Sequence, residues 1–323
     1  MVLFKRVLVA GLFLIIVAQS VFASSKNDTH TITLFVIPSM HPIVWDSPAT
    51  LYESTKACFL KTLGLADNYL LGHMTVQLES SLLDKPMVLA QTSGTVEEKT
   101  NLILKQKIGF GILGATLTGR IETEEEIEHK LSVYAKREKL TFISYRINEK
   151  AMKRILSFIE QYQKKITENQ APYNFYGGAF WPRFKNEGAG CSTFGMALLD
   201  VVGIKAEDSV WKKQVRIPKE IIGGVFNNNK KIRVRTIKNA VSWHDGNGIP
   251  NVDFVNYFSY EPSIMFDWIN DYLKENPLSV IQKKGVNGLL LDKQHIEFDE
   301  TKPLFVERTE PNLFIEYFKK IIQ

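Results

Sequence analysis

The chemistry of this sequence centres on Cys191, which stands between a loop rich in glycine and aromatic residues and a segment with helical periodicity. Residues 173–190 combine tyrosines, glycines and Pro182, a composition typical of an ordered loop. After the cysteine, apolar residues recur at three- and four-residue steps, at Phe194, Ala197, Leu198, Val201 and Val202. Gly203 then suits a helix stop. Cys191 is therefore expected at the first turn of a buried helix, where the helix dipole lowers the pKa of a thiol and favours nucleophilic catalysis.

His73 and Gln91 are the residues expected to assist Cys191, because a thiol nucleophile needs a base and a group that orients the base. His73 lies in an alternating stretch, residues 72–78, that is typical of a half-buried strand. A turn near residue 82 and a second strand over residues 87–91 complete a hairpin. With equal arms, Gln91 lies opposite His73, whereas Glu79 is about 20 Å further along the strand. Gln91 is therefore the better orienting partner.

The order histidine, polar residue, cysteine resembles the circularly permuted branch of the NlpC-like papain superfamily, to which lecithin–retinol acyltransferase also belongs. The matching features are Gly72-His73 at the start of a strand, Gln91 on the next strand, and Gly190-Cys191-Ser192-Thr193-Phe194 after a tyrosine-rich loop. A helix expected over residues 149–168 also precedes the loop, as in that family. The resemblance spans about residues 34–204.

This resemblance implies an antiparallel sheet packed on the helix that carries the nucleophile, and thiol chemistry on an amide or ester. It implies that Cys191 is the nucleophile, His73 the general base and acid, and Gln91 the orienting group. The backbone N–H of Cys191 would contribute to an oxyanion hole. In this family the third group is often charged or an imidazole, and a neutral Gln91 stabilises cationic His73 less.

The fold class expected is α+β, with residues 31–204 as a permuted papain-like domain and residues 205–323 as a C-terminal α/β extension of unassigned role. Besides the segments above, we expect strands over residues 31–37, 115–121, 140–147 and 231–235. We expect helices over residues 48–63, 96–105, 123–137, 149–168, 262–275 and 312–322. The 231–235 strand would have one basic face, typical of a solvated surface or of contact with an anionic polymer.

Residues 1–23 are expected to be a signal peptide. Lys5 and Arg6 precede an apolar run over residues 7–18, and Val21-Phe22-Ala23 matches a small-residue cleavage pattern. The run is short for a membrane span, and no second long apolar run follows. The mature protein is therefore expected to be exported, periplasmic or secreted, without stable membrane insertion after cleavage; a retained N-terminal anchor is the alternative.

The composition and two short motifs argue against several classes of ligand. The chain has 323 residues, 45% of them hydrophobic and 23% charged, as in globular proteins with a core. Removing Lys5 and Arg6 reduces the net charge from +5 to +3, which is too weak to favour nucleic acid. A G-x-G-x-x-G at residues 109–114 precedes a strand rather than a helix, and Ile249 breaks a calcium-like loop at residues 245–249. Neither a cofactor nor a metal is expected.

The expected function is an exported cysteine hydrolase that cleaves an amide bond, with a peptide or a cell-wall-derived compound as substrate. The substrate class rests on export and on the family resemblance. Acyl transfer uses the same chemistry and stays open. Two alternatives are a non-catalytic envelope binding protein on a papain-like scaffold and a globular protein with a structural Cys58–Cys191 disulfide, because an exported protein with two cysteines invites a bridge.

Overall fold

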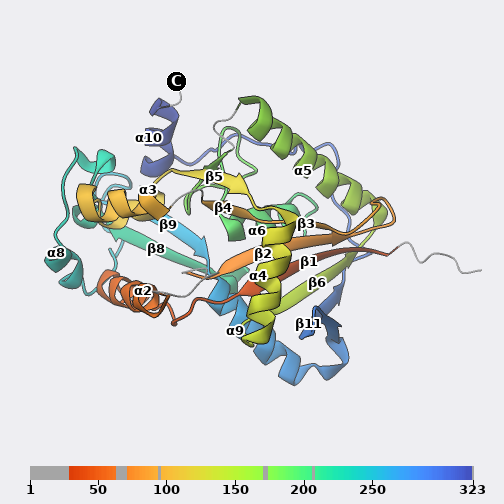
Figure 1. Cartoon of the computed structure of the whole chain (residues 1–323). Coiled ribbons are helices and arrows are strands. Elements are labelled where there is room, and N and C mark those ends of the chain that lie inside the picture. The colour runs from red at the N-terminus through yellow and green to blue at the C-terminus, as the bar shows by residue number, and fades with distance from the viewer. Residues whose placement is uncertain (1–28, 63–70, 94–95, 170–173, 206–207, 322–323) are drawn as a thin grey trace, which may run out of the picture.

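The protein is described here by a computed structural model, which covers residues 29–62, 71–93, 96–169, 174–205 and 208–321 (Figure 1). The predicted signal peptide, residues 1–23, lies outside these ranges. Helices and strands alternate irregularly along the chain, and the sheets combine parallel and antiparallel pairs. The fold is therefore α+β, as the sequence predicts.

The largest sheet has six strands in the order β10-β11-β6-β1-β2-β3. Its strands are β1 (His30–Ile37), β2 (His73–Glu79), β3 (Met87–Leu89), β6 (Thr141–Ile147), β10 (Val280–Lys283) and β11 (Val286–Asp292). Neighbouring strands are antiparallel except β11 and β6, which run parallel with Gly288 opposite Phe142. Because β10 and β11 come after residue 204, this sheet crosses the predicted boundary between domain and extension.

Two smaller sheets adjoin the large one. The first joins β4 (Gln91–Ser93), β5 (Leu117–Ile121) and β7 (Phe175–Tyr176) in that order. The second pairs β8 (Lys212–Pro218) with β9 (Phe254–Tyr260). Only Ala90 separates β3 from β4, so the predicted strand over residues 87–91 is in fact two strands that pair with different neighbours.

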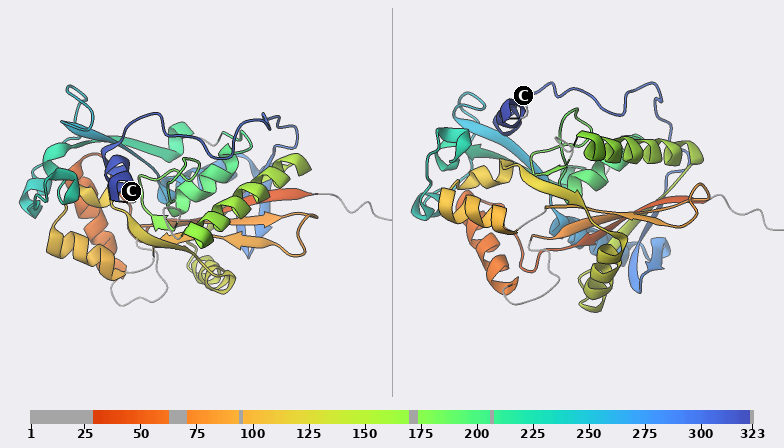
Figure 2. Two further views of the ribbon diagram at one scale, coloured as in Figure 1. Left: turned by 90° about the horizontal axis from the view of Figure 1, so that it is seen from above. Right: turned by 45° about the horizontal axis from the view of Figure 1, so that its top comes forward.

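Helices cover both faces of the large sheet (Figure 2). The longer ones are α2 (Pro48–Thr62), α4 (Glu124–Lys136), α5 (Glu149–Asn169), α6 (Cys191–Asp200), α9 (Pro262–Glu275) and α10 (Leu313–Ile321). The shorter ones are α3 (Val96–Thr100), the π-helical η1 (Asn101–Gln106), α7 (Asp208–Trp211) and α8 (Val234–Lys238). Helices α5 and α6 share one core with Leu34 and Val36 of β1, whereas α4 packs with Phe35 and Ile37 of the same strand. Alternate residues of β1 thus serve the two faces.

Local sequence signals explain several helix ends. The Thr123 side chain and the Glu126 carboxylate form a reciprocal capping box at the start of α4. Asn148 Oδ1 accepts from the Ala151 N–H at 2.8 Å and begins α5, which confirms Asn148 as its cap. Gly203 adopts φ 73° after α6, the left-handed conformation expected at a helix end.

Two further predicted elements are different in the structure. Residues 231–235 are not a strand: the helix α8 begins at Val234, where alternating charges had suggested a two-residue period. Alternation would place Ile232 and Val234 on one face, but Ile232 is buried and Val234 is exposed, so the two-residue period does not hold here. The predicted helix over residues 96–105 changes from α3 to the π-helix η1 at Asn101.

A C-terminal strap, residues 300–308, crosses the loop that precedes α6. Arg183 donates to the carbonyls of Pro303 at 3.0 Å and Leu304 at 3.2 Å. Arg308 donates to both carboxylate oxygens of Glu187 at 2.7 and 2.8 Å, and the Glu187 side chain is fully buried. The strap therefore fixes the loop that leads to Cys191. Within the described residues, no helix has both the length and the apolarity needed to span a bilayer.

Candidate active site

Cys191 is the first residue of α6, as the sequence predicts, and is 9% exposed. Gly190 caps the helix, and its N–H donates to Thr193 Oγ1 at 2.8 Å. The helix packs on β2, where the Sδ atom of Met74 lies 2.4 Å from the position of a Cβ at Gly195. A glycine at 195 thus permits the close approach that brings the start of α6 to the start of β2.

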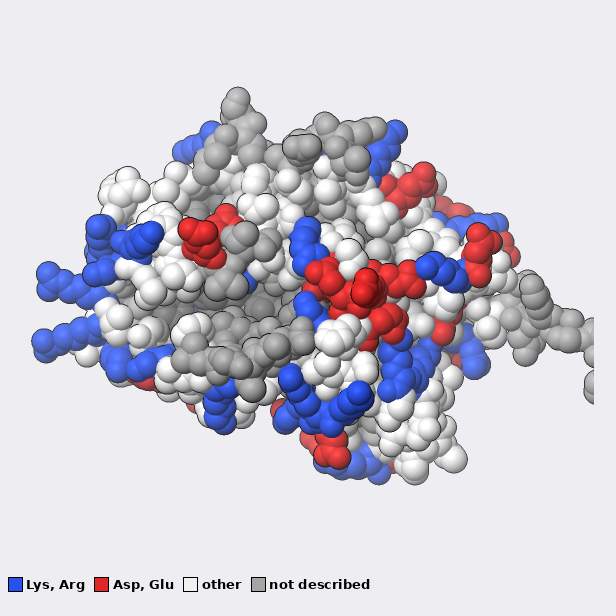
Figure 3. All heavy atoms as spheres, in the orientation of Figure 1, with Lys and Arg blue, Asp and Glu red and all other residues white. Residues whose placement is uncertain are grey.

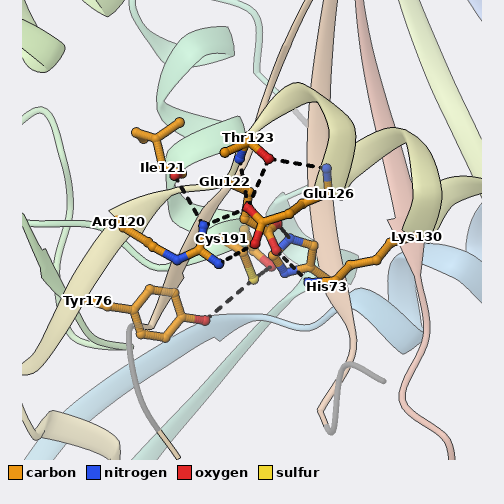
Figure 4. Close-up of polar contacts among 10 residues, drawn as sticks. His73, Arg120, Ile121, Glu122, Thr123, Glu126, Lys130, Tyr176 and Cys191 are labelled. Carbon is orange, nitrogen blue, oxygen red and sulfur yellow. Dashed lines mark hydrogen bonds and ion pairs between the residues drawn. The ribbon is translucent and has the colours of Figure 1, made fainter. Parts of the chain in front are cut away.

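His73 is the first residue of β2 and is 2% exposed. Its Nε2 atom is 2.9 Å from Oε2 of Glu122, a fully buried carboxylate between β5 and α4 (Figure 4). Lys130 of α4 donates to the other oxygen, Oε1, at 2.8 Å. Burial on its own raises the pKa of Glu122, but the hydrogen bonds and charges of His73 and Lys130 outweigh burial and lower it to about 2.

The imidazole of His73 and the thiol of Cys191 are hydrogen-bonded and interact through their charges. Burial lowers the pKa of His73, but the charge of Cys191 and the hydrogen bonds with Cys191 and Glu122 outweigh it and raise this pKa to about 9. Burial also raises the pKa of Cys191, but the charge and hydrogen bond of His73 lower it to about 7. Between these values the pair holds a thiolate and an imidazolium.

Tyr176 of β7 completes the polar surroundings of the sulfur. Its hydroxyl donates to Cys191 Sγ at 3.7 Å. Burial and the charge of Cys191 raise the pKa of Tyr176 well above its usual range, so the hydroxyl stays protonated. The backbone of Cys191 acts against this rise in the pKa of Tyr176, and the backbone of Met74 helps to lower the pKa of Cys191. A neutral O–H donor therefore lies beside the sulfur and the helix N-terminus.

Gln91 lies away from the position that the sequence predicts, because the hairpin is shifted by one residue. A hairpin with equal arms would pair Gln77 with residue 87, but Gln77 is paired with Val88. A shift of one residue in the pairing turns each side chain of a strand to the other face of the sheet. Gln91 instead belongs to β4, opposite Ile121 of β5. Its amide is fully buried, and neither polar atom has a hydrogen bond within the described part of the chain. Glu122, not Gln91, contacts His73.

The sequence did not indicate Glu122, because its position depends on the pairing of β4 with β5, the strand that Glu122 directly follows. The Glu122 N–H donates to the carbonyl of Ala90 at 2.9 Å, which fixes the carboxylate beside the start of β2. One sequence signal was available: Glu122 sits between a strand and the Thr123 helix cap, outside the exposed acidic run of α4.

Cys58 and Cys191, both among the described residues, are not joined by a disulfide. Cys58 is fully buried in α2, as expected for a core residue of that helix. The alternative of a structural Cys58–Cys191 bridge is therefore wrong. Within the described ranges, no group of three or more His, Cys, Asp or Glu side chains could hold a metal ion.

Comparison with protein-family models, with curated proteins and with solved structures finds no match to this chain.

Proposed function

We propose that this protein is an exported cysteine hydrolase that cleaves an amide bond through Cys191, His73 and Glu122. The observation that supports the proposal most is the contact between the Cys191 thiol and the His73 imidazole at the start of α6, with Glu122 on the far side of the ring. A nucleophile, a base and a group that orients the base are what thiol catalysis requires.

The chemical steps follow from these positions. The Cys191 thiolate attacks the carbonyl carbon of the substrate, and the carbonyl oxygen becomes an oxyanion. The His73 imidazolium then gives its proton to the leaving amine as the C–N bond breaks, which leaves a thioester on Cys191. A water molecule loses a proton to His73 and attacks the thioester. The C–S bond breaks, the acid product departs, and the Cys191 thiolate and the His73 imidazolium are restored. The anionic Glu122 stabilises the imidazolium form of His73 throughout.

Two donors could stabilise the oxyanion. One is the backbone N–H of Cys191 at the positive end of α6. The other is the Tyr176 hydroxyl, which donates to the sulfur and would turn toward the substrate oxygen when the substrate binds. Both donors lie in a buried site, where hydrogen bonds to a developing charge are strong, and the backbone N–H is held in place by the helix.

The proposal includes a permuted papain-like arrangement, because the base on β2 precedes the nucleophile on α6 in the chain and α6 packs on that strand. Glu122 replaces the predicted Gln91 as the third group. An anionic residue here agrees better with the charged third residue often found in the resembling family. Export rests on the signal peptide predicted at residues 1–23, and a peptide or cell-wall-derived substrate rests on export together with the family resemblance.

The direct test is acyl-enzyme formation. Wild-type protein mixed with p-nitrophenyl acetate should release a burst of nitrophenol equal to the concentration of active sites, and mass spectrometry should find the acetyl group on Cys191. Cys191→Ser should abolish the burst, whereas Cys58→Ser, the matched control, should keep it. Cleavage of amide bonds is then assayed on soluble cell-wall peptides. Absence of both burst and cleavage in wild type would leave the non-catalytic binding protein as the better account.

A further inference from the structure

Residues 103–107 and 225–235 lie side by side and form one surface, here called the basic–apolar face. The Ile232 N–H donates to the Lys107 carbonyl at 2.8 Å, and the Gly223 N–H donates to the Ile108 carbonyl at 2.9 Å. These backbone hydrogen bonds join the end of η1 to the segment that leads into α8. Segments more than a hundred positions apart thus make a continuous patch.

The charges on this face are all positive. Its exposed cations are Lys105, Lys107, Lys230, Lys231, Arg233 and Arg235. Neither segment contains Asp or Glu, and the nearest acidic residues along the chain, Glu98 and Glu220, each lie five positions before a segment. Lys230 Nζ donates to the backbone carbonyl of Glu220 at 3.2 Å. Figure 3 shows Lys and Arg gathered over this end of the molecule, at the left, with the largest group of acidic residues over α4 and a smaller one over α3.

Apolar side chains are exposed among these cations. Leu104 is 64% exposed, Ile103 50%, Val234 47% and Val225 41%. Ile103 and Leu104 stand directly before Lys105, and Val234 stands between Arg233 and Arg235. A surface that only needs to be solvated gains nothing from exposing four aliphatic side chains to water, since each burial from water is favourable.

We propose that the basic–apolar face binds the surface of an anionic lipid bilayer. Lys and Arg side chains are attracted to anionic headgroups, and neighbouring aliphatic side chains enter the boundary between headgroups and acyl chains. A hydrophilic polyanion would use the cations and leave the aliphatic side chains in water. The combination of both kinds of side chain on one face therefore favours lipid.

The face is connected to the candidate active site through one helical segment. Helix α3 continues directly into η1, and the charge of Cys191 acts on the Lys99 ammonium of α3. A bilayer bound at residues 103–107 would thus lie beside the helix whose Lys99 is influenced by the charge of Cys191. Binding to lipid does not depend on the proposed hydrolase activity, because the face and the Cys191–His73 pair share no residue.

The test is co-sedimentation with two kinds of vesicle, one of phosphatidylcholine alone and one in which a third of the lipid is phosphatidylglycerol. Wild type should bind the anionic vesicles and release at high salt. The triple variant Lys231→Gln, Arg233→Gln, Arg235→Gln should bind at least about ten-fold more weakly. The double variant Ile103→Ser, Leu104→Ser should also weaken binding while keeping the salt dependence.

The matched control removes three exposed cations elsewhere, Lys136→Gln, Lys274→Gln and Lys302→Gln, and should bind as wild type does. All proteins share one N-terminus, so a retained apolar leader contributes equally to each. Cys191→Ser should bind normally, which separates this proposal from the proposed catalysis. The proposal is overturned if the triple variant and the control behave alike. It is also overturned if wild type does not bind vesicles but binds heparin, and the triple variant does not bind heparin. That result would assign the face to a soluble polyanion.

Discussion

Glu122 accepts a hydrogen bond from Nε2 of His73 at 2.9 Å. A carboxylate with its pKa near 2 can only accept, so Nε2 carries the hydrogen and Nδ1 is the nitrogen that serves Cys191. This contact fixes both the orientation of the ring and the charge of the pair. Lys130 in turn holds the carboxylate from α4.

Replacing Glu122 by Gln should therefore make the Cys191 thiol less acidic. Without the carboxylate the pKa of His73 falls, the imidazolium no longer stabilises the thiolate as well, and the pKa of Cys191 rises from about 7. Alkylation of Cys191 by iodoacetamide, measured by peptide mass spectrometry, should rise through pH 7 in wild type and about one pH unit higher in Glu122→Gln.

The matched control is Glu124→Gln, which removes an exposed carboxylate paired with Lys85 at the protein surface. It should leave the alkylation profile unchanged. Equal profiles for wild type and Glu122→Gln would contradict the assigned role of Glu122.

Tyr176→Phe should lower kcat and leave KM nearly unchanged, because the hydroxyl is proposed to stabilise the transition state more than the bound substrate. A decrease of about 10²-fold is expected for loss of one such donor. The measurement is kcat and KM on a substrate identified by the acyl-enzyme assay. A rise in KM with kcat intact would assign Tyr176 to substrate binding instead.

Gly188→Ala should disturb the loop before Cys191 far more than Gly190→Ala. A Cβ at position 188 would lie 1.8 Å from the Phe175 carbonyl oxygen, whereas one at position 190 would lie 3.4 Å from its nearest atoms. Because Phe175 O is backbone, the loop itself must move, at a cost of about 1–3 kcal/mol in unfolding free energy. Urea unfolding of the two variants compares the sites, and equal midpoints would contradict the close approach.

Arg308→Leu should destabilise the protein by about 3–5 kcal/mol, because it leaves the buried Glu187 carboxylate without its partner. The double variant Arg308→Leu, Glu187→Gln should recover much of that loss, since no charge then remains buried. Urea unfolding of wild type, both single variants and the double variant gives the coupling free energy. Additive losses would show that the two side chains act independently.

Sequence patterns predicted the elements that depend on neighbours close in the chain. The helix that begins at Cys191, the strand that begins at His73 and the Asn148 cap are local signals, and the structure has all three. The third group of the site was not accessible in this way. No local pattern reveals that β3 ends at Leu89 and that the next strand pairs with β5, which is what brings Glu122 to His73.

The β10–β11 hairpin was also absent from the predictions, although it has a local signal. Lys284 and Gly285 both have positive φ and connect Lys283 to its partner Val286 through a two-residue turn, the geometry that suits a tight hairpin. What the sequence could not indicate is where this hairpin docks. Its parallel pairing with β6 depends on residues that are far apart in the chain.

That pairing has a consequence for how the chain acquires its structure. The backbone groups along the outer edge of β6 have no strand partner until residues 286–292 have been synthesised, because Phe142 pairs with Gly288. Contacts of such long range form slowly, and an open strand edge attracts other chains meanwhile. A truncated chain that ends near residue 204 would expose this edge. It would also expose the apolar core surface that Met265 and Leu289 cover in the complete protein. Such a fragment should aggregate, whereas in the complete chain β11 pairs with this edge of β6.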